Sequence, residues 1–545
     1  MKKVIFVGLF LAPCLLSHAQ SIERAKKLIN YERFESAKNE LRSVIDKGDY
    51  SPDAVYWLAE IYLNQNNIDS AKTVLQSKAG DILKQPYSKK ESALVYIGWA
   101  HMLLDSGKTA DARAQMEQIL TETKYKDADA LLAVARANMQ SKNGDSLWVI
   151  DLLNKAIKRD KKNPELYTTL GDVYRKRIDG SNAVRNYELA LQADPSYVEA
   201  LYKEGKIYKT QNNAEVYLER FKKAYDIDST YSPALYELYY HYYFLDVVTA
   251  KKFLDAYIRH SDPSPEHAYM QTDLFYVSKK YEEAINGAKN IIAEQGDSVE
   301  PRLFKLIAYS QAALGDSTAA LDNMNKYFAK QDTSGLVVKD YALKASLMEN
   351  VSPDKAAAIE LYRKAIKLEQ DKEAKLEYMI SLADLQKGIG NREREALWRG
   401  RIYETKEKPT NLDIYKWGMA LYSEKDYAKA DSVFAIYEEK YPDHIHGYLW
   451  RARSNALIDT AMTQGLAVPH FKKLIEVAAA DSVKNKSILL TAYEYLGGYE
   501  ANITKNYSAS LDYFMKLTSI DPENEDANKN IAILKKWIED GKGNN

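Results

Sequence analysis

Apolar residues recur along the chain in two alternating stripes, each with the spacing of an α-helix. The first stripe contains Tyr167, Leu170, Gly171 and Tyr174, and the second contains Ala183, Tyr187 and Ala190. Residues three or four positions apart share one helix face, so the pattern predicts two helices that meet along these stripes. We expect the small residues to let the two backbones approach closely. A single pair cannot bury both of its faces, so further pairs must stack on it.

The same pattern returns one period later in the chain. The positions of Leu170, Gly171, Tyr174, Ala183, Tyr187, Ala190 and Pro195 are taken in the second copy by Glu204, Gly205, Tyr208, Tyr217, Phe221, Ala224 and Ser229. A strong copy between residues 411 and 442 contains Ile414, Trp417, Gly418, Leu421, Ala430, Phe434, Tyr437 and Pro442. On these residues the chain resembles the tetratricopeptide repeat (TPR) family. The resemblance implies an all-α fold, a right-handed superhelical solenoid of antiparallel helix pairs.

The small residue of the second helix marks successive repeats along the chain. It recurs as Ala37, Ala71, Ala112, Ala183, Ala284, Ala320, Ala358, Ala396 and Ala430. From this marker the resemblance predicts roughly 12 to 14 repeats over residues 21–540. Longer intervals between some markers indicate lengthened helices or loops, so we expect a continuous but irregular array.

The prolines of one short segment divide the array. Pro263 and Pro265 disfavour helix and restrict the residue before each of them, so we expect a hinge or boundary at residues 260–267. The predicted organisation is a signal peptide (1–19), an N-terminal TPR array (20–262), a C-terminal TPR array (266–524), and a capping helix and tail (525–545).

The N-terminus has the pattern of a targeting segment. Lys2 and Lys3 precede an apolar run over residues 4–12, and Ser17 and Ala19 are small residues where a signal peptidase acts. We expect cleavage after Ala19 and an exported, periplasmic protein of a Gram-negative-type envelope. Residues 11–14 weakly resemble a lipobox, so a lipid anchor on Cys14 is the minor alternative.

Charge, cysteine content and hydropathy exclude several further classes of protein. The chain has 545 residues and a formal net charge of -1, which becomes -3 once the two lysines of the leader are removed. This charge argues against nucleic-acid binding. Cys14 is the only cysteine, so the mature protein is expected to have no disulfide. We also expect no transmembrane segment in the mature chain, because no later apolar run reaches about 18 residues; peripheral or lipid-anchored membrane association stays open.

Motifs for catalysis and cofactor binding are incomplete. Residues 105–109 look like the end of a phosphate-binding loop, but Met102 stands where that motif requires its first glycine. Asp443, His444 and His446 form a short cluster without a distant partner, which is more typical of a solvated turn than of a metal site. We therefore expect no catalytic residue, no cofactor, no metal and no enzymatic activity.

The family resemblance gives a map of the binding surface. TPR arrays use their inner helices to line a concave groove that receives a peptide or a partner's helix. In that register the predicted partner-binding residues are Asp172, Arg175, Lys176, Tyr202, Lys206, Tyr236, Tyr240, Tyr243 and Phe244. A chaperone-type carboxylate clamp is not expected, because Thr168 and Asp172 occupy places where that clamp uses lysine and asparagine.

The tyrosine-rich helix near residues 234–245 supports two interpretations. Its aromatic residues cannot all lie on one buried stripe, so they either pack against helices on both sides or form an exposed platform. We predict a non-catalytic scaffold or adaptor of the bacterial cell envelope that binds a protein or peptide in the concave groove. The alternative is a carbohydrate- or peptidoglycan-binding module that uses the tyrosine-rich groove.

Overall fold

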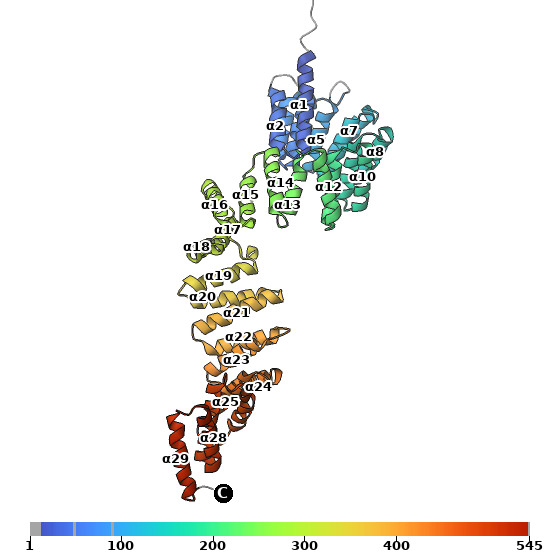
Figure 1. Ribbon diagram of the computed structural model, residues 1–545. Coiled ribbons are helices and arrows are strands. Elements are labelled where there is room, and N and C mark those ends of the chain that lie inside the picture. Colours follow the sequence, from blue (N-terminus) through green and yellow to red (C-terminus); the bar gives the residue numbers. More distant parts are fainter. Residues whose placement is uncertain (1–11, 47–50, 89–91, 543–545) are drawn as a thin grey trace, which may run out of the picture. The chain divides into compact units, whose positions relative to one another are not determined.

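The computed structural model describes residues 12–46, 51–88 and 92–542, apart from the side chains of residues 12–18. Every regular element in this part of the chain is helical, which confirms the all-α solenoid (Figure 1). The chain divides into two compact units, Met1–Val299 and Glu300–Asn545. Each unit is described by itself below.

The first unit is built from eight successive helix pairs. Its helices are α1 (Ala12–Asn30), α2 (Phe34–Asp46), α3 (Pro52–Asn64), α4 (Ile68–Leu83), α5 (Ala93–Asp105), α6 (Thr109–Glu122), α7 (Ala128–Gln140), α8 (Ser146–Arg159), α9 (Pro164–Lys176), α10 (Gly180–Ala193), α11 (Val198–Thr210), α12 (Ala214–Ile227), α13 (Ser232–Tyr242), α14 (Val247–His260), α15 (Pro265–Val277) and α16 (Tyr281–Gln295), followed by the 3-10 turn η1 (Gly296–Ser298).

The second unit continues the same alternation. It contains α17 (Arg302–Ala313), α18 (Ser317–Lys330), η2 (Thr333–Gly335), α19 (Val338–Val351), α20 (Lys355–Leu368), α21 (Lys372–Gly388), α22 (Arg392–Thr405), α23 (Asn411–Ser423), α24 (Tyr427–Lys440), α25 (Ile445–Ile458), α26 (Val468–Ala478), η3 (Ala479–Asp481), α27 (Lys486–Tyr499), the π-turn η4 (Glu500–Thr504), α28 (Tyr507–Ile520) and α29 (Glu525–Glu539). Leu534 of α29 is buried in a cluster with Phe514 and Leu517 of α28, so α29 covers the apolar face of the preceding pair.

Close approach of the two helices in a pair depends on the glycine predicted from the repeat. A Cβ atom added to Gly171 would lie 2.4 Å from the Tyr187 ring, and one added to Gly418 would lie 2.6 Å from the Phe434 ring. Both aromatic side chains are fully buried. The marker alanines are buried as well, and they lie on the even-numbered helices α2, α4, α6, α10, α16, α18, α20, α22 and α24. The spacing in the sequence therefore identified the true contact between paired helices.

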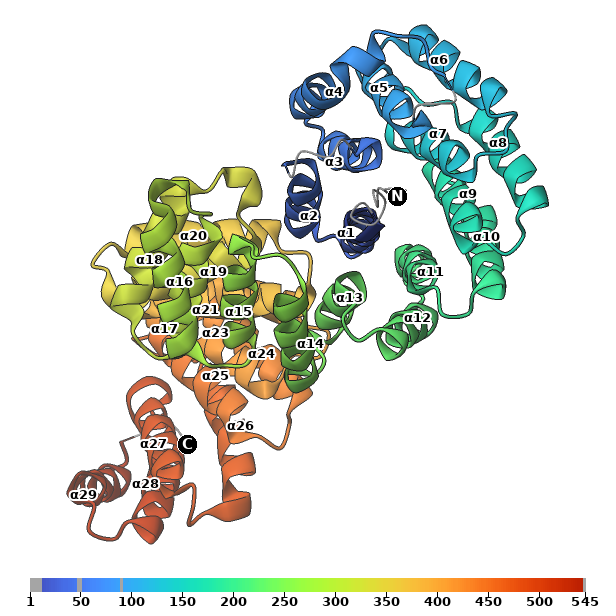
Figure 2. The ribbon, with the colours of Figure 1, turned by 90° about the horizontal axis from the view of Figure 1, so that it is seen from above.

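The first unit closes onto its own beginning. The Tyr31 hydroxyl donates a hydrogen bond to Asp228, and the hydroxyl of Ser232 donates to the Tyr31 carbonyl. The Tyr31 ring meets Tyr231 edge-on, with centroids 5.1 Å apart. Figure 2 shows the chain returning to α1 at α13 after it has passed through the intervening pairs. The helices up to α14 thus form one closed superhelical turn.

Asp262 completes this closure from the segment between α14 and α15. Its carboxylate accepts hydrogen bonds from the backbone N–H groups of Glu35 (2.7 Å) and Ser36 (3.1 Å) and from the Ser36 hydroxyl. These N–H groups belong to the first turn of α2, whose amides have no partner within the helix. The proline-containing segment therefore supplies the N-terminal cap of α2. Asp262 lies 226 positions after Ser36 in the sequence.

Two predicted boundaries stay predictions. The boundary between the two compact units falls between Val299 and Glu300, whereas the hinge or boundary expected from the sequence lies at residues 260–267. The signal peptide falls partly outside the described residues, as does the side chain of Cys14. The backbone of α1 runs from Ala12 through the predicted cleavage site after Ala19 without interruption.

Candidate functional site

The closed turn of the first unit surrounds a cavity of about 550 Å³. Its walls come from the odd-numbered helices, which are the inner helices of the turn (Figure 2). Charged and aromatic lining residues are Glu23, Lys26, Lys27, Tyr31, Asp53, Trp57, Glu60, Asp129, Arg136, Glu165, Asp172, Tyr197, Glu199 and Lys203. A concave, mostly preformed hollow with convergent polar groups is the usual setting of a binding site.

One wall of the cavity carries a network of ion pairs in which Asp172 is buried and its partners are partly exposed. The Lys203 ammonium lies 2.6 Å from Asp172 and 2.6 Å from Glu199. Asp172 also accepts a hydrogen bond from the Tyr187 hydroxyl at 2.9 Å, so the network is tied to the aromatic residue that packs on Gly171. Burial acts to lower the pKa of Lys203, but the two carboxylates outweigh it and raise that pKa. This lysine therefore stays charged, and the wall is rigidly positioned.

Another wall presents an indole ring between two cations. The Lys26 ammonium lies 5.6 Å from the centroid of the Trp57 ring, and the Arg136 guanidinium lies 4.9 Å from it. Arg136 also forms an ion pair with Glu165. Cations at these distances are attracted to the face of the aromatic ring.

Two carboxylates of the lining have no cationic partner among the described residues. Asp53 accepts a hydrogen bond from the Ser92 hydroxyl at 3.1 Å, and Asp129 is exposed in the first turn of α7. The lining holds seven carboxylates and four basic side chains, which leaves it with a formal charge of -3. The cavity is therefore suited to a ligand that carries positive charge.

The predicted charged residues lie on inner helices but not all in the cavity. Asp172 lines it. Lys176 instead donates to the carbonyls of Asn138 (3.0 Å) and Ser141 in the neighbouring repeat. Lys206 forms an ion pair with Glu237 at 2.6 Å, and Arg175 lies on the exposed side of Asp172 at 3.8 Å.

The predicted aromatic residues divide between core and surface. Tyr202 is half-buried against Phe221 and Tyr231. Tyr236 and Tyr240 are partly exposed, with ring centroids 4.7 Å apart. Tyr243 is half-buried, while Phe244 projects into solvent from the turn after α13. The structure thus does not gather the nine predicted residues into one site, and their role in binding stays a prediction.

Sequence reasoning missed the cavity residues of the earlier repeats. Trp57, Arg136 and Lys203 were not among the predicted positions. The same repeat register, extended back to α3 and α7, selects Asp53, Glu60, Asp129 and Arg136. The signal was therefore available for Arg136 once the boundaries of its repeat were correct, whereas Trp57 and Lys203 lie outside the register.

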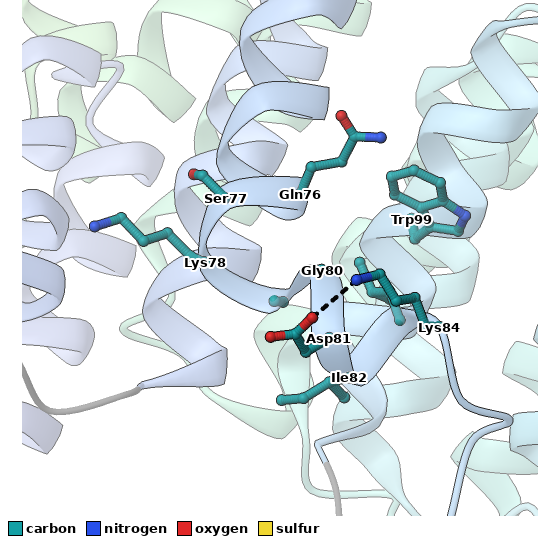
Figure 3. A pocket seen from close by; sticks show the side chains of 10 residues that line it. Gln76, Ser77, Lys78, Gly80, Asp81, Ile82, Lys84 and Trp99 are labelled. Carbon is teal, nitrogen blue, oxygen red and sulfur yellow. Dashed lines mark hydrogen bonds and ion pairs between the residues drawn. The ribbon is translucent and has the colours of Figure 1, made fainter.

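A second hollow, of about 480 Å³, lies between the C-terminal half of α4 and Trp99 of α5. Figure 3 shows Asp81 and Lys84 joined across its rim, at 2.9 Å. Both side chains are largely exposed, and the hollow has no buried ionisable group among the residues that line it. It is the weaker candidate for a binding site.

Neither metal ligation nor a membrane span is found in the described residues. No group of three or more His, Cys, Asp or Glu side chains there could hold a metal ion. None of the helices described is long and apolar enough to cross a membrane.

Comparison with known proteins places the repeats in a family. Profiles described as tetratricopeptide repeat match residues 28–77, 97–146 and 414–444. With the helix pairs and the glycine–aromatic contacts described above, these matches identify the chain as a TPR protein. Such repeats mark it as a scaffold for protein–protein interaction.

Individual relatives are distant. The chain is 29% identical, over 163 residues, to a barley (Hordeum vulgare) protein named as a probable UDP-N-acetylglucosamine–peptide N-acetylglucosaminyltransferase SPINDLY. That stretch is 28% of this chain and only 16% of the barley protein. The chain therefore spans less than a fifth of that relative's length.

Among solved structures, the chain is similar to the C-terminal part of a TPR repeat-containing protein from Cytophaga hutchinsonii. The identity is 25%, the match covers 48% of this chain and 99% of that one, and the TM-score is 0.35. A tetratricopeptide repeat protein from Parabacteroides merdae is 18% identical, with 46% and 96% of the two chains covered and a TM-score of 0.33.

Proposed function

We propose that this protein is an exported, non-catalytic adaptor of a bacterial cell envelope that holds a segment of a protein partner in the cavity of its first unit. The observation that carries the proposal is the cavity itself, which is enclosed by inner helices and lined by a fixed ion network and an indole ring. Aromatic residues would supply affinity, and the surplus negative charge would select a positively charged segment.

Reversal of one charge in the cavity tests this proposal. Asp129→Arg places a cation in the first turn of an inner helix that lines the cavity. Asp111→Arg makes the same change in the first turn of α6, an even-numbered helix outside the lining, and serves as the matched control. Both positions are exposed, so both variants should fold.

The measurement is affinity capture from crosslinked envelopes of the source cells, quantified by mass spectrometry. We expect a defined set of proteins to be captured by the wild type and by Asp111→Arg and lost from Asp129→Arg. Capture of the same set by all three proteins would remove the cavity as the binding site. N-terminal sequencing of the mature protein tests export separately, with Gln20 expected as the first residue.

A glycan-binding role is the second candidate, and the partly exposed Tyr236 and Tyr240 rings favour it. Aromatic rings offer apolar area and a hydroxyl to a sugar at little cost in side-chain entropy. Titration with soluble peptidoglycan fragments, followed by tyrosine fluorescence, should then show saturable binding that Tyr240→Ala removes. No change in fluorescence with the wild type would exclude this candidate.

A further inference from the structure

Strongly exposed apolar side chains are concentrated in the turns between helices of the first unit. Of the six most exposed large apolar side chains in the described residues, five belong to this unit. These five are Leu147 (66%), Ile178 (94%), Phe244 (81%), Leu245 (72%) and Val248 (81%). Each lies in the turn after an odd-numbered helix or at the second residue of the helix that follows.

The turns after α5, α7 and α9 are neighbours on one side of the unit. The Asn143 side chain, in the turn after α7, donates to the Leu104 carbonyl near the end of α5 at 2.8 Å. Lys176, at the end of α9, donates to the Ser141 carbonyl in that same turn. The turn between α13 and α14 lies at the lower edge of the unit in Figure 1. We call this edge the turn edge.

Exposed basic side chains lie beside the turn between α13 and α14 and in the turn that follows α15. Lys222 of α12 is exposed, and its ammonium lies 5.7 Å from the centroid of the Tyr242 ring at the end of α13. Lys279 and Lys280 are exposed in the next turn, between α15 and α16. None of these three lysines forms an ion pair with a described residue, so their charge is available to an external anion.

The acidic residue of the turn between α13 and α14 is already engaged within the protein. The Asp246 carboxylate accepts hydrogen bonds from the backbone N–H groups of Val248 and Thr249, both at 3.1 Å, and from the Thr249 hydroxyl at 2.6 Å. Burial lowers the pKa of His241, and the charges of Lys222 and Lys209 lower it further. Lys222 therefore places a positive charge beside this turn.

We propose that the turn edge docks on the surface of an anionic lipid bilayer, with Phe244, Leu245 and Val248 as the inserting tip. Single apolar residues on separate projecting turns fit a soft surface that each can enter, whereas a protein partner would need a matching hollow for every turn. The unpaired lysines would meet anionic headgroups. Tyr240, one helical turn before Phe244, and Tyr243, directly before it, lie where tyrosines favour the membrane–water interface.

This inference rests on the proposed function only in placing the adaptor beside an envelope membrane. Binding to vesicles does not depend on the cavity, so Asp129→Arg should bind vesicles like the wild type. Loss of a protein partner and loss of vesicle binding are therefore separate results.

The test is co-sedimentation of the full chain with vesicles of phosphatidylcholine alone or mixed 7:3 with phosphatidylglycerol. The tip variant is Phe244→Ser/Leu245→Ser/Val248→Ser. Its control is Val337→Ser/Leu412→Ser/Val483→Ser, which removes three exposed apolar side chains from the second unit. Circular dichroism checks that both variants keep the helical content of the wild type.

We expect the wild type and the control to bind the anionic vesicles, with affinity at least tenfold higher than that of the tip variant. Lys222→Gln/Lys279→Gln/Lys280→Gln should weaken binding and flatten its dependence on salt. Equal binding by the tip variant, equal binding to neutral vesicles, or no vesicle binding by the wild type would each overturn the proposal. The last outcome, combined with loss of a protein partner from the tip variant, would make the turn edge a protein interface.

A label at the tip gives a direct readout. Because Cys14 is the only cysteine, Leu245→Cys can carry an environment-sensitive dye in a Cys14→Ser background. The dye emission should shift to the blue on addition of anionic vesicles. The same dye at Val483→Cys should show no shift, and an equal shift at both sites would contradict insertion of the tip.

Discussion

The two units are built from the same repeat, but they differ in the sequence separation of the residues that contact each other. In the unit Met1–Val299, hydrogen bonds join residues as distant as Arg33 and Asp262, 229 positions apart. In the unit Glu300–Asn545, a long-range ion pair such as that of Lys486 with Asp521 spans 35 positions, about one repeat. Closure gives the first unit contacts that neighbour stacking alone does not provide. The second unit keeps the nearest-neighbour character typical of solenoids.

The largest expected effects come from removing matched core aromatics. Phe221 packs on Gly205 in the first unit and Phe434 on Gly418 in the second, and in both pairs a Cβ atom added to the glycine would lie 2.6 Å from the ring. Both rings are fully buried, so Phe221→Ala and Phe434→Ala should each cost about 3–5 kcal/mol of stability. Hydrogen exchange should show loss of protection throughout the closed turn for Phe221→Ala, but only near α23 to α25 for Phe434→Ala.

That comparison fails if the two variants behave alike. Loss of protection in α17 and α18 on Phe434→Ala would show that the second unit is as cooperative as the first. Loss confined to the repeats beside α12 on Phe221→Ala would show that closure does not couple the first unit.

A smaller effect is expected from breaking the closure itself. Asp262→Ala removes the carboxylate that caps α2, which should cost about 1–2 kcal/mol. Amides of α1 and α2 should then exchange faster, although the substitution lies 226 positions from Ser36. Asp354→Ala is the matched control, because Asp354 caps only its own helix, α20, through the Ala357 N–H at 3.0 Å. Its effect should stay within the first turn of α20, and unchanged exchange in α2 of the Asp262 variant would argue against the closure.

The smallest expected effect is a pH dependence in the first unit. Burial acts to lower the pKa of His101, but Glu60 at 2.9 Å and Asp105 at 3.6 Å outweigh it and raise that pKa above its ordinary value. The stabilisation is therefore complete below the unfolded pKa of about 6.5 and is lost as pH rises through the folded pKa. The melting temperature of the wild type should fall above pH 6.5 relative to that of His101→Asn.

The imidazoles of the second unit should behave in the opposite way. Burial lowers the pKa of His446 and His470, so their contribution is present above pH 6.5 and is lost as pH falls below it. A window from pH 6.5 to 8.5 therefore isolates His101. Parallel melting curves for the wild type and His101→Asn across this window would contradict the raised pKa.

The repeat pattern predicted local packing well because each contact lies within one period of the sequence. The glycine at 171 and the aromatic at 187 are 16 positions apart, and their contact follows from two adjacent helices alone. Closure through Tyr31 and Asp228 spans 197 positions and leaves no periodic trace. Closure arises because each repeat is rotated slightly relative to the one before it, and these rotations add up over six helix pairs. The size of each rotation depends on details of side-chain packing, which the spacing of apolar residues in the sequence does not determine.

The residues of the candidate site, too, could be predicted only in part from the sequence. Asp172 was predicted from the register of a strong repeat and does line the cavity. Trp57 and Arg136 come from repeats with weaker patterns, and the stacking of successive inner helices places them in one cavity with Asp172. The exposure of Phe244 could not be decided from a helix in which nearly every residue is aromatic, because both faces look equally apolar.

The capping of α2 by Asp262 also imposes an order on biosynthesis. A ribosome adds about 5–20 residues per second, so the 226 positions between Ser36 and Asp262 take roughly 10–45 s to synthesise. Throughout this interval the first turn of α2 lacks its capping carboxylate. The N-terminal cap of α2 can therefore form only after the chain has been synthesised as far as the proline-flanked aspartate.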